Sequence, residues 1–259
     1  MNILEYEMIE MLKVLKEKHD VFEIKAEYEN EGTRETELMR LKDVTEKAKL
    51  PIILKIGGVE AITDIYNALS IGVKGIIAPM AETAFAAGKF LDSIDTFVPE
   101  DNRKDIEFAI NIETITAYNN FNDILNLKKI NFLSSITVGR VDFVSSLQKD
   151  RKFANSEKMF EYCVDVFTKA KEKGLKTALG GAISLDSIDF IKKLSDRDLL
   201  DKFETRKLVY GKNSISSIDK AINLGVKFEL TWLKSKRRYY HRIRNEDEKR
   251  IEMLEKRLN

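Results

Sequence analysis

Residues 51–79, PIILKIGGVEAITDIYNALSIGVKGIIAP, hold two apolar runs separated by a stretch with helical periodicity. The first run, 51–56, ends at a pair of glycines, and the second, 73–79, ends at a proline. Both are rich in β-branched residues, which is typical of buried strands. The segment 60–71 between them is long enough for about three turns of helix. A strand, a helix and a second strand in this order predict a βαβ unit with parallel strands.

The same alternation continues along the rest of the chain. Further strand-like runs lie at 21–27, 106–112, 134–139, 175–180 and 207–210. Further helix-like segments lie at 2–19, 35–48, 83–94, 157–173 and 185–194. Together with the two runs above, this makes seven strands that alternate with helices. Such alternation predicts a parallel sheet.

We predict an α/β fold, a (β/α)8 barrel of the TIM type, followed by an extra C-terminal helix. A barrel of this kind has eight strands and a typical length of about 250 residues, close to the 259 residues of this chain. The sequence shows seven strands, one fewer than a closed barrel needs. The eighth would be the N-terminal strand, which is either missing, hidden in the first helix-like segment or replaced by that helix. An open, doubly wound sheet is the alternative, but the GxGxxG motif of dinucleotide-binding sheets follows none of the strands.

The charges of the chain almost cancel, with 44 Lys and Arg against 43 Asp and Glu. No net field attracts a polyanion, so we expect a small molecule as partner, and neither nucleic acid nor a membrane. The single cysteine, Cys163, excludes an internal disulfide and a zinc site built from several cysteines. The first residues lack the features of a signal peptide, and no apolar stretch approaches the roughly 20 residues of a membrane span. These features are typical of a cytoplasmic protein.

Residues 234–259 differ in composition from the rest of the chain. They are dense in charge and carry only a narrow apolar stripe, formed by Tyr240, Ile243, Ile251, Leu254 and Leu258. We therefore divide the chain into a barrel domain, 1–233, and a charged helical tail, 234–259. A helix of this kind packs either on a neighbouring subunit or on the wall of its own barrel. We favour the first, and hence a homo-oligomer.

Polar side chains that end apolar runs are the best candidates for chemistry, because the active site of a parallel barrel lies at the C-terminal ends of its strands. The candidates are Glu27, Lys55, Glu82, Glu113, Asp142 and the pair Gly180-Gly181. Several carboxylates that converge on one mouth would repel each other unless a cation lay between them. Hard oxygen ligands, without His or Cys near the strand ends, point to Mg²⁺ or Mn²⁺ rather than Zn²⁺.

The chain resembles the superfamily of metal-dependent 2-keto-acid aldolases of the HpcH/HpaI type and citrate lyase beta subunits. The stretches that carry the resemblance are LKIGGVEAITDIYNALSIGVKGIIAPMAET (54–83), NIETITAYNNFNDIL (111–125) and TVGRVDF (137–143). The resemblance implies that Glu113 and Asp142 bind Mg²⁺ or Mn²⁺. It also implies that this metal holds the carboxylate and keto oxygens of pyruvate.

Two positions depart from the family pattern. The strand-end arginine of the family, which contacts the keto acid, falls on Lys55, which keeps the charge but lacks the planar fork. The Glu-His pair of the family falls on Glu27-Tyr28, so no histidine stands where the aldolases have their base. The two histidines of the chain lie in the first helix-like segment and in the tail. The proton is therefore expected to move through Glu27, Tyr28, Lys25 or metal-bound water.

Other polar residues are candidates for holding the substrate. Gly180 and Gly181 with Ser184 either expose amides at a helix N-terminus, where a phosphate or carboxylate can bind, or only let the backbone turn. Arg206 is placed either to clamp a second acidic group of the substrate or to form a surface ion pair. Carboxylates that follow strands have a structural alternative too, because they are favoured as helix caps and as ion-pair partners.

Three functions follow from these residues. The first is a lyase that makes or breaks a carbon–carbon bond in a 2-oxo-acid through an enolate, with Lys55 on the substrate carboxylate and Glu27 or Tyr28 moving the proton. The second is a transferase that uses phosphoenolpyruvate or an acyl group on the same scaffold. The third is a catalytically inactive subunit that binds a keto acid, which the lost histidine favours.

Overall fold

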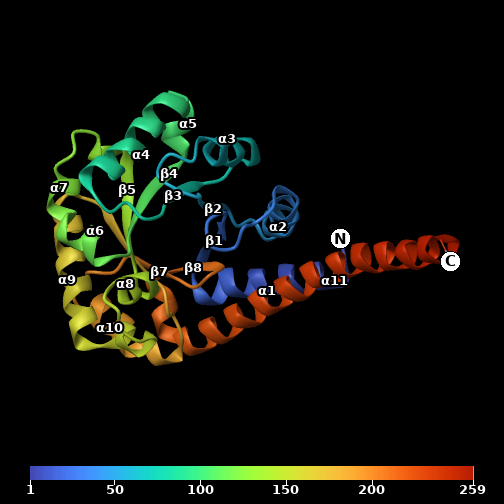
Figure 1. Cartoon of the computed structure of the whole chain (residues 1–259). Helices are drawn as coiled ribbons and strands as arrows, with labels where there is room; N and C mark the ends of the chain where they lie inside the picture. The colour runs from blue at the N-terminus through green and yellow to red at the C-terminus, as the bar shows by residue number, and fades with distance from the viewer. Residues whose placement is uncertain (259) are drawn as a thin grey trace.

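The computed structural model describes residues 1–258 and shows a closed barrel of eight strands wrapped by helices (Figure 1). The strands are β1 (Val21–Glu27), β2 (Ile52–Lys55), β3 (Gly75–Ala78), β4 (Glu107–Ile112), β5 (Leu133–Gly139), β6 (Lys176–Gly180), β7 (Lys202–Glu204) and β8 (Leu208–Gly211). They follow one another around the ring in chain order, and β8 closes it against β1. The predicted fold, an α/β barrel with an extra C-terminal helix, is confirmed.

Helices connect the strands on the outside of the barrel. They are α1 (Ile3–His19), α2 (Glu35–Ala48), α3 (Ile62–Ile71), α4 (Ala84–Phe97), α5 (Glu100–Asp105), α6 (Ile115–Asn119), α7 (Phe121–Leu125), α8 (Arg140–Ser146), α9 (Glu157–Glu172), α10 (Ile188–Asp196) and α11 (Ile218–Leu258). Four 3-10 turns join them, η1 (Ile130–Phe132), η2 (Arg151–Asn155), η3 (Leu185–Ser187) and η4 (Lys212–Ser217). The helices predicted at 35–48 and 157–173 coincide with α2 and α9 within one residue.

Apolar side chains pack on both faces of the sheet, because successive residues of a strand point to opposite faces. Ile24, Ile76 and Ile110 are fully buried and belong to a large core shared with the helices. A separate small cluster fills the inside of the barrel and consists of Ile53, Ile77, Ala109 and Val209. Lys55 comes two positions after Ile53, and Glu113 comes four positions after Ala109, so this inner cluster lies beneath both of them.

The eighth strand lies near the C-terminal end of the barrel rather than at the N-terminus. The sequence predicts no strand at β7, because KFE is short and two of its three residues are charged. Only three residues separate β7 from β8, which is too short for a helical crossover, so the chain turns back. As a result β8 pairs antiparallel with both β7 and β1. The prediction of a wholly parallel sheet is therefore wrong for β8, and a helix, α1, precedes β1.

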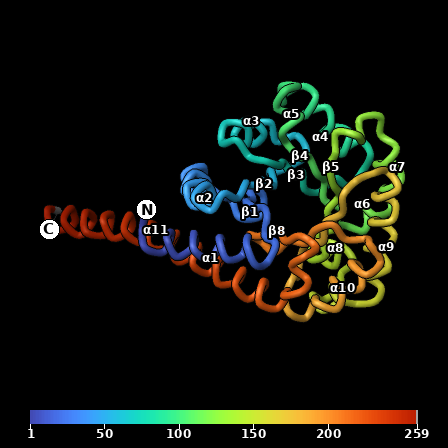
Figure 2. Tube along the Cα trace, turned by 180° about the vertical axis from the view of Figure 1, so that it is seen from behind, coloured from blue at the N-terminus to red at the C-terminus, as the bar shows by residue number. Residues whose placement is uncertain are grey.

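Helix α11 is one continuous helix of 41 residues. Its first half packs against α1, and the two helices run side by side along one flank of the barrel (Figures 1 and 2). Its last part continues beyond the barrel, and the predicted boundary at 233/234 falls inside the helix. Within residues 1–258 no helix has the length and apolar character needed to cross a membrane.

Candidate active site

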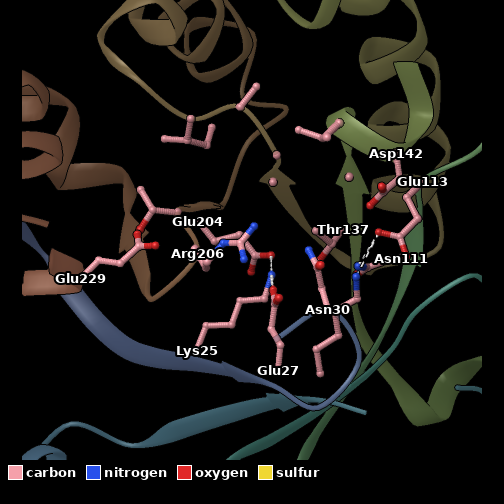
Figure 3. A pocket seen from close by; sticks show the side chains of 18 of the residues that line it. Lys25, Glu27, Asn30, Asn111, Glu113, Thr137, Asp142, Glu204, Arg206 and Glu229 are labelled. Atoms are coloured by element: carbon pink, nitrogen blue, oxygen red, sulfur yellow. Dashed lines mark hydrogen bonds and ion pairs between the residues drawn. The ribbon is translucent and has the colours of Figure 1, made fainter. Parts of the chain in front are cut away.

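The C-terminal ends of the parallel strands surround a cavity of about 310 Å³ (Figure 3). Its walls come from β1, β2, β4, β5, β6 and β7, from the loops that follow them, and from α11. Five carboxylates and four cationic side chains line it, namely Glu27, Glu113, Asp142, Glu204 and Glu229 with Lys25, Lys55, Arg151 and Arg206. This lining suits a small, charged molecule rather than an apolar one.

Glu113, the residue after β4, is held in a single orientation by three donors. Its Oε1 accepts the backbone N–H of Met80 at 3.0 Å, and its Oε2 accepts the side-chain amide of Asn111 at 3.0 Å. The ammonium of Lys55 lies 3.4 Å from the same Oε2. A Cβ atom on Gly139 of β5 would come within 2.7 Å of this oxygen, so only glycine leaves room for the carboxylate. Glu113 caps no helix, because Thr114 is the N-cap of α6.

Asp142 lies in the first turn of α8, directly after β5. It is half-buried and lines the same cavity as Glu113. Figure 3 shows the two side chains next to each other at one edge of the cavity. The two side chains lie together because β4 and β5 are neighbouring parallel strands whose C-terminal ends meet at one rim.

The donors at this edge fit a small hard cation. Mg²⁺ prefers oxygen ligands and is commonly held by one or two carboxylates while it keeps several waters. Glu113 and Asp142 supply two carboxylates, and Asn111 Oδ1 is a buried oxygen that no hydrogen-bond donor of the described chain reaches. No group of three or more His, Cys, Asp or Glu side chains suited to a metal occurs within 1–258. The site therefore fits a cation with few protein ligands, and not a zinc-type cage.

Lys55, at the end of β2, is the cation nearest to this edge. Its ammonium lies between Glu113 and Glu29, 3.0 Å from Glu29 Oε2, and its side chain is only 6% exposed. Burial opposes the charged form, but Glu113 and Glu29 outweigh it and raise the pKa of Lys55. Lys55 is therefore a permanent positive charge at neutral pH, able to attract a carboxylate but unsuited to form a Schiff base.

A second buried ion cluster lies on β1 and β7. The ammonium of Lys25 is 2.5 Å from Glu204 Oε1 and 3.1 Å from Glu27 Oε1. Burial favours the neutral form of Lys25, but the two carboxylates outweigh this effect and raise its pKa. Burial also opposes the charge of Glu27, and Lys25 outweighs it, so the pKa of Glu27 is lowered. Lys25 and Glu27 are therefore both charged at neutral pH, and Glu27 is an available proton acceptor at the cavity wall.

The remaining predicted residues divide into two groups. Gly180, Gly181 and Arg206 line the cavity. Tyr28 and Ser184 do not, and their predicted contact with a substrate finds no support in their positions. Tyr28 follows Glu27 and so points away from the barrel interior, where burial raises the pKa of its hydroxyl. The N–H of Ser184 donates to Ser187 Oγ at 2.9 Å within the η3 turn, so it is not free for an anion.

Several lining residues lie outside the strand-end candidates drawn from the sequence, among them Asn111, Lys25, Glu204 and Glu229. Asn111 and Lys25 each lie two positions before a predicted residue, so strand alternation puts them on the same inward face as Glu113 and Glu27. The sequence carries this signal, although it names Lys25 only as one possible base. Glu204 lies in β7, which no apolar run reveals, and only the structure places it. Glu229 of α11 reaches the cavity from a helix that the sequence connects only with packing.

One comparison with known proteins identifies a family. The family model described as HpcH/HpaI aldolase/citrate lyase matches residues 37–186. No curated protein sequence matches the chain significantly.

Several solved structures share the fold. An HpcH/HpaI aldolase from Desulfitobacterium hafniense DCB-2 is 15% identical, with a TM-score of 0.60 over 86% of this chain and 88% of that one. The citrate synthase SbnG is 15% identical, with a TM-score of 0.61 over 88% and 90%. An HpcH/HpaI aldolase/citrate lyase family protein from Burkholderia cenocepacia J2315 is 12% identical, with a TM-score of 0.58 over 91% and 90%. At such identities these likenesses establish the fold alone.

Proposed function

Because the chain belongs to the HpcH/HpaI aldolase/citrate lyase family, we propose that it is a lyase that uses Mg²⁺ or Mn²⁺ to make or break a carbon–carbon bond in a small 2-oxo-acid. One observation carries the proposal. Glu113 and Asp142, on neighbouring strand ends, line one edge of a charged cavity with the buried Lys55 beside them.

Glu113 and Asp142 would hold the ion. When bound, such an ion acts as a Lewis acid for the negative charge that develops on the 2-oxo oxygen. Lys55 offers a fixed positive charge to the carboxylate of the substrate, as a point charge and not as the two-pronged clamp of an arginine. The backbone of Gly180 and Gly181 walls the cavity, and Arg206 at its mouth offers a second cation to a longer, dianionic substrate.

Glu27 is the residue we propose to move the proton. It lines the cavity, whereas Tyr28 faces away from it, and the adjacent Lys25 keeps its carboxylate charged. A carboxylate with a lowered pKa is a weaker base than histidine, so we expect slower proton transfer than a histidine-based site would give. The Lys25–Glu204 contact fixes the position of Lys25, which in turn orients Glu27.

The test is the release of pyruvate from 4-hydroxy-2-oxo-acids, with and without Mg²⁺. We expect turnover that needs the ion and falls at least about 100-fold in Glu113→Gln, because even outer-shell partners of a metal are worth about 10–100-fold. Calorimetric titration with Mg²⁺ alone should show weaker binding to the same variant. Glu172→Gln is the matched control, since Glu172 is exposed at the end of α9 and does not line the cavity.

Other outcomes would contradict the lyase. Thermal stabilisation by phosphoenolpyruvate but not by pyruvate would favour the transferase. Binding of pyruvate without turnover, across a panel of 4-hydroxy-2-oxo-acids, would favour a subunit that binds a keto acid and does not react. If Glu113→Gln bound Mg²⁺ as well as the wild type, Glu113 would not be a ligand of the ion.

We also propose that the protein is a homo-oligomer that binds its substrate as a small molecule. The support is the charged tail with its narrow apolar stripe, which extends past the barrel in Figure 1.

A further inference from the structure

The last part of α11 lies outside the barrel without a packed neighbour. Residues 241–257 are exposed along their whole length, and both views show them projecting past the N-terminus (Figures 1 and 2). At about 1.5 Å per residue, this segment is about 25 Å long. Most helical stability in proteins comes from the packing of one face of the helix rather than from helix propensity. The segment therefore gains stability if another helix packs on it.

The stripe on this segment has a symmetric spacing. Its first four residues, Tyr240, Ile243, Ile251 and Leu254, follow one another at intervals of three, eight and three residues, with Asp247 midway between Ile243 and Ile251. At about 100° per residue, all of them point within about 40° of the direction of Asp247. Ile243, Ile251 and Leu254 are 44%, 50% and 45% exposed. Because the spacing reads the same in both directions, the stripe matches a copy of itself that runs the opposite way.

We propose that the projecting part of α11 is a self-association surface for a second copy of this chain, with the two helices antiparallel and a two-fold axis at Asp247. Ile243 of one copy lies level with Ile251 of the other, and Tyr240 lies level with Leu254, on each side of the axis. This pairing covers Ile243, Ile251 and Leu254 of both copies, whereas the ring of Tyr240 also carries Arg34 of its own chain at 4.9 Å. An interface of this kind is isologous, so it closes at two copies.

The charges beside the stripe fit the antiparallel direction. Residues 234–244 contain six Lys and Arg and no Asp or Glu, whereas residues 245–258 contain all five Asp and Glu of the tail together with four Lys and Arg. Antiparallel pairing sets the basic half of one copy beside the nearly neutral half of the other, which holds all the acidic residues. Arg237 then lies near Glu255 of the second copy. Parallel pairing would set the two basic halves against each other, which is unfavourable.

A groove at the base of the tail accommodates the end of the second copy. It has a volume of about 520 Å³ and lies between α2 and α11, with Met39, Trp232, Tyr239 and Tyr240 among its walls. In the antiparallel arrangement, residues 254–257 of the second copy lie level with 237–240, at the rim of this groove. The last turn of the second helix therefore continues the interface onto the barrel.

The first test is sedimentation of the full chain over a range of concentrations. We expect a monomer–dimer equilibrium that Ile243→Asp shifts to monomer at every concentration. Asn245→Asp is the matched control, because position 245 points to the opposite side of the helix from Asp247. A monomer in the unchanged chain at millimolar concentration, or a dimer that Ile243→Asp leaves intact, would overturn the proposal.

A charge exchange tests the direction of pairing. Arg237→Glu and Glu255→Arg should each raise the dissociation constant about fivefold, since each removes two exposed ion pairs per dimer. The double variant should restore it. The two positions are about 27 Å apart along one helix, so such a rescue requires contact between copies. Additive weakening in the double variant would contradict the antiparallel register.

Cross-linking tests the position of the axis. Asp247→Cys should form a disulfide-linked dimer under mild oxidation, whereas Asn245→Cys should not. Cys163 does not interfere, because it is fully buried. Equal cross-linking at the two positions would show that the helix has no preferred face. None of these residues lines the cavity, so failure of the dimer would leave the proposed lyase activity untouched, and failure of the lyase would leave the dimer.

Discussion

At the scale of single residues, Arg140 joins two segments next to the cavity, namely the loop after β6 and the η2 turn. It is fully buried, and no carboxylate of the described chain pairs with it. Its guanidinium donates instead to the carbonyl oxygens of Gly181 at 2.8 Å and Ala154 at 3.0 Å, and to Asn155 Oδ1 at 2.8 Å. Burial lowers the pKa of Arg140 to about 10, which leaves it charged at neutral pH. The planar fork thus holds the loop after β6 against α8.

Replacing the guanidinium of Arg140 should lower both the stability of the fold and the affinity for the substrate. We expect Arg140→Lys to lower the free energy of unfolding by about 3 kcal/mol, because an ammonium cannot reach all of these acceptors and leaves buried carbonyls unpaired. The Michaelis constant should rise, since Gly181 walls the cavity. Urea denaturation and steady-state kinetics are the measurements. Arg206→Lys, on an exposed residue, should change stability by less than about 0.5 kcal/mol. A wild-type unfolding midpoint in Arg140→Lys would refute this role.

At the scale of elements, apolar periodicity predicted every strand that carries an apolar run. It found β1 to β6 and β8, and it placed Lys55, Glu113 and Asp142 on one rim, because the ends of neighbouring parallel strands meet there. It could not find β7, where KFE has one apolar residue, and so missed Glu204 and the reversal of β8. Strand alternation alone puts Tyr28 on the opposite face from Glu27, so Tyr28 became a candidate through the family pattern and not through the strand. A strand as short as β7 is settled by packing rather than by pattern.

The start of β7 is fixed by Asp201 instead of by apolar residues. Its carboxylate accepts the N–H of Thr177 at 2.8 Å and pairs with Lys171 at 3.0 Å, which ties β7 to β6 and α9. Burial opposes this charge, but the Thr177 N–H and Lys171 outweigh it, so the pKa of Asp201 is lowered. A carboxylate with a lowered pKa in the folded state stabilises the fold above its unfolded pKa of about 3.9, and the contribution is lost as pH falls through the folded value.

Asp201→Asn should therefore lower stability in a pH-dependent way. We expect a loss of about 1–2 kcal/mol at pH 7, from hydrogen bonds to a partly exposed charge. The difference from the wild type should shrink as the pH falls below about 4, where the aspartate itself becomes neutral. Urea unfolding at several pH values measures this. The exposed Asp105→Asn should show little difference at any pH. If the difference in unfolding free energy between the wild type and Asp201→Asn stayed constant or widened in acid, Asp201 would contribute by shape and not by charge.

At the scale of the whole molecule, β8 joins the barrel to α11. The ring of Tyr210 on β8 stacks on Phe203 of β7 at 4.9 Å and is fully buried, and its hydroxyl donates to the carbonyl of Ala221 at 3.3 Å. Helix α11 also packs tightly against this strand at Gly225. A Cβ atom there would lie 2.1 Å from Tyr210 Oη and 2.9 Å from Leu208 Cδ1. The absence of a side chain at Gly225 is thus what lets α11 dock, and with it Glu229 reaches the cavity.

Two Gly→Ala substitutions should therefore change the free energy of unfolding in opposite directions. Alanine is favoured over glycine inside a helix by about 1 kcal/mol. Gly88→Ala in α4 should gain roughly that amount, because its Cβ meets only Leu127 Cδ2, at 3.9 Å. Gly225→Ala should instead lose about 1–3 kcal/mol, since overpacking against a rigid buried ring exceeds the helical gain. Thermal unfolding gives both signs. Because α11 supplies Val226 and Glu229 to the cavity, Gly225→Ala should also weaken turnover. If both substitutions stabilised the protein equally, α11 would have to dock loosely on β8.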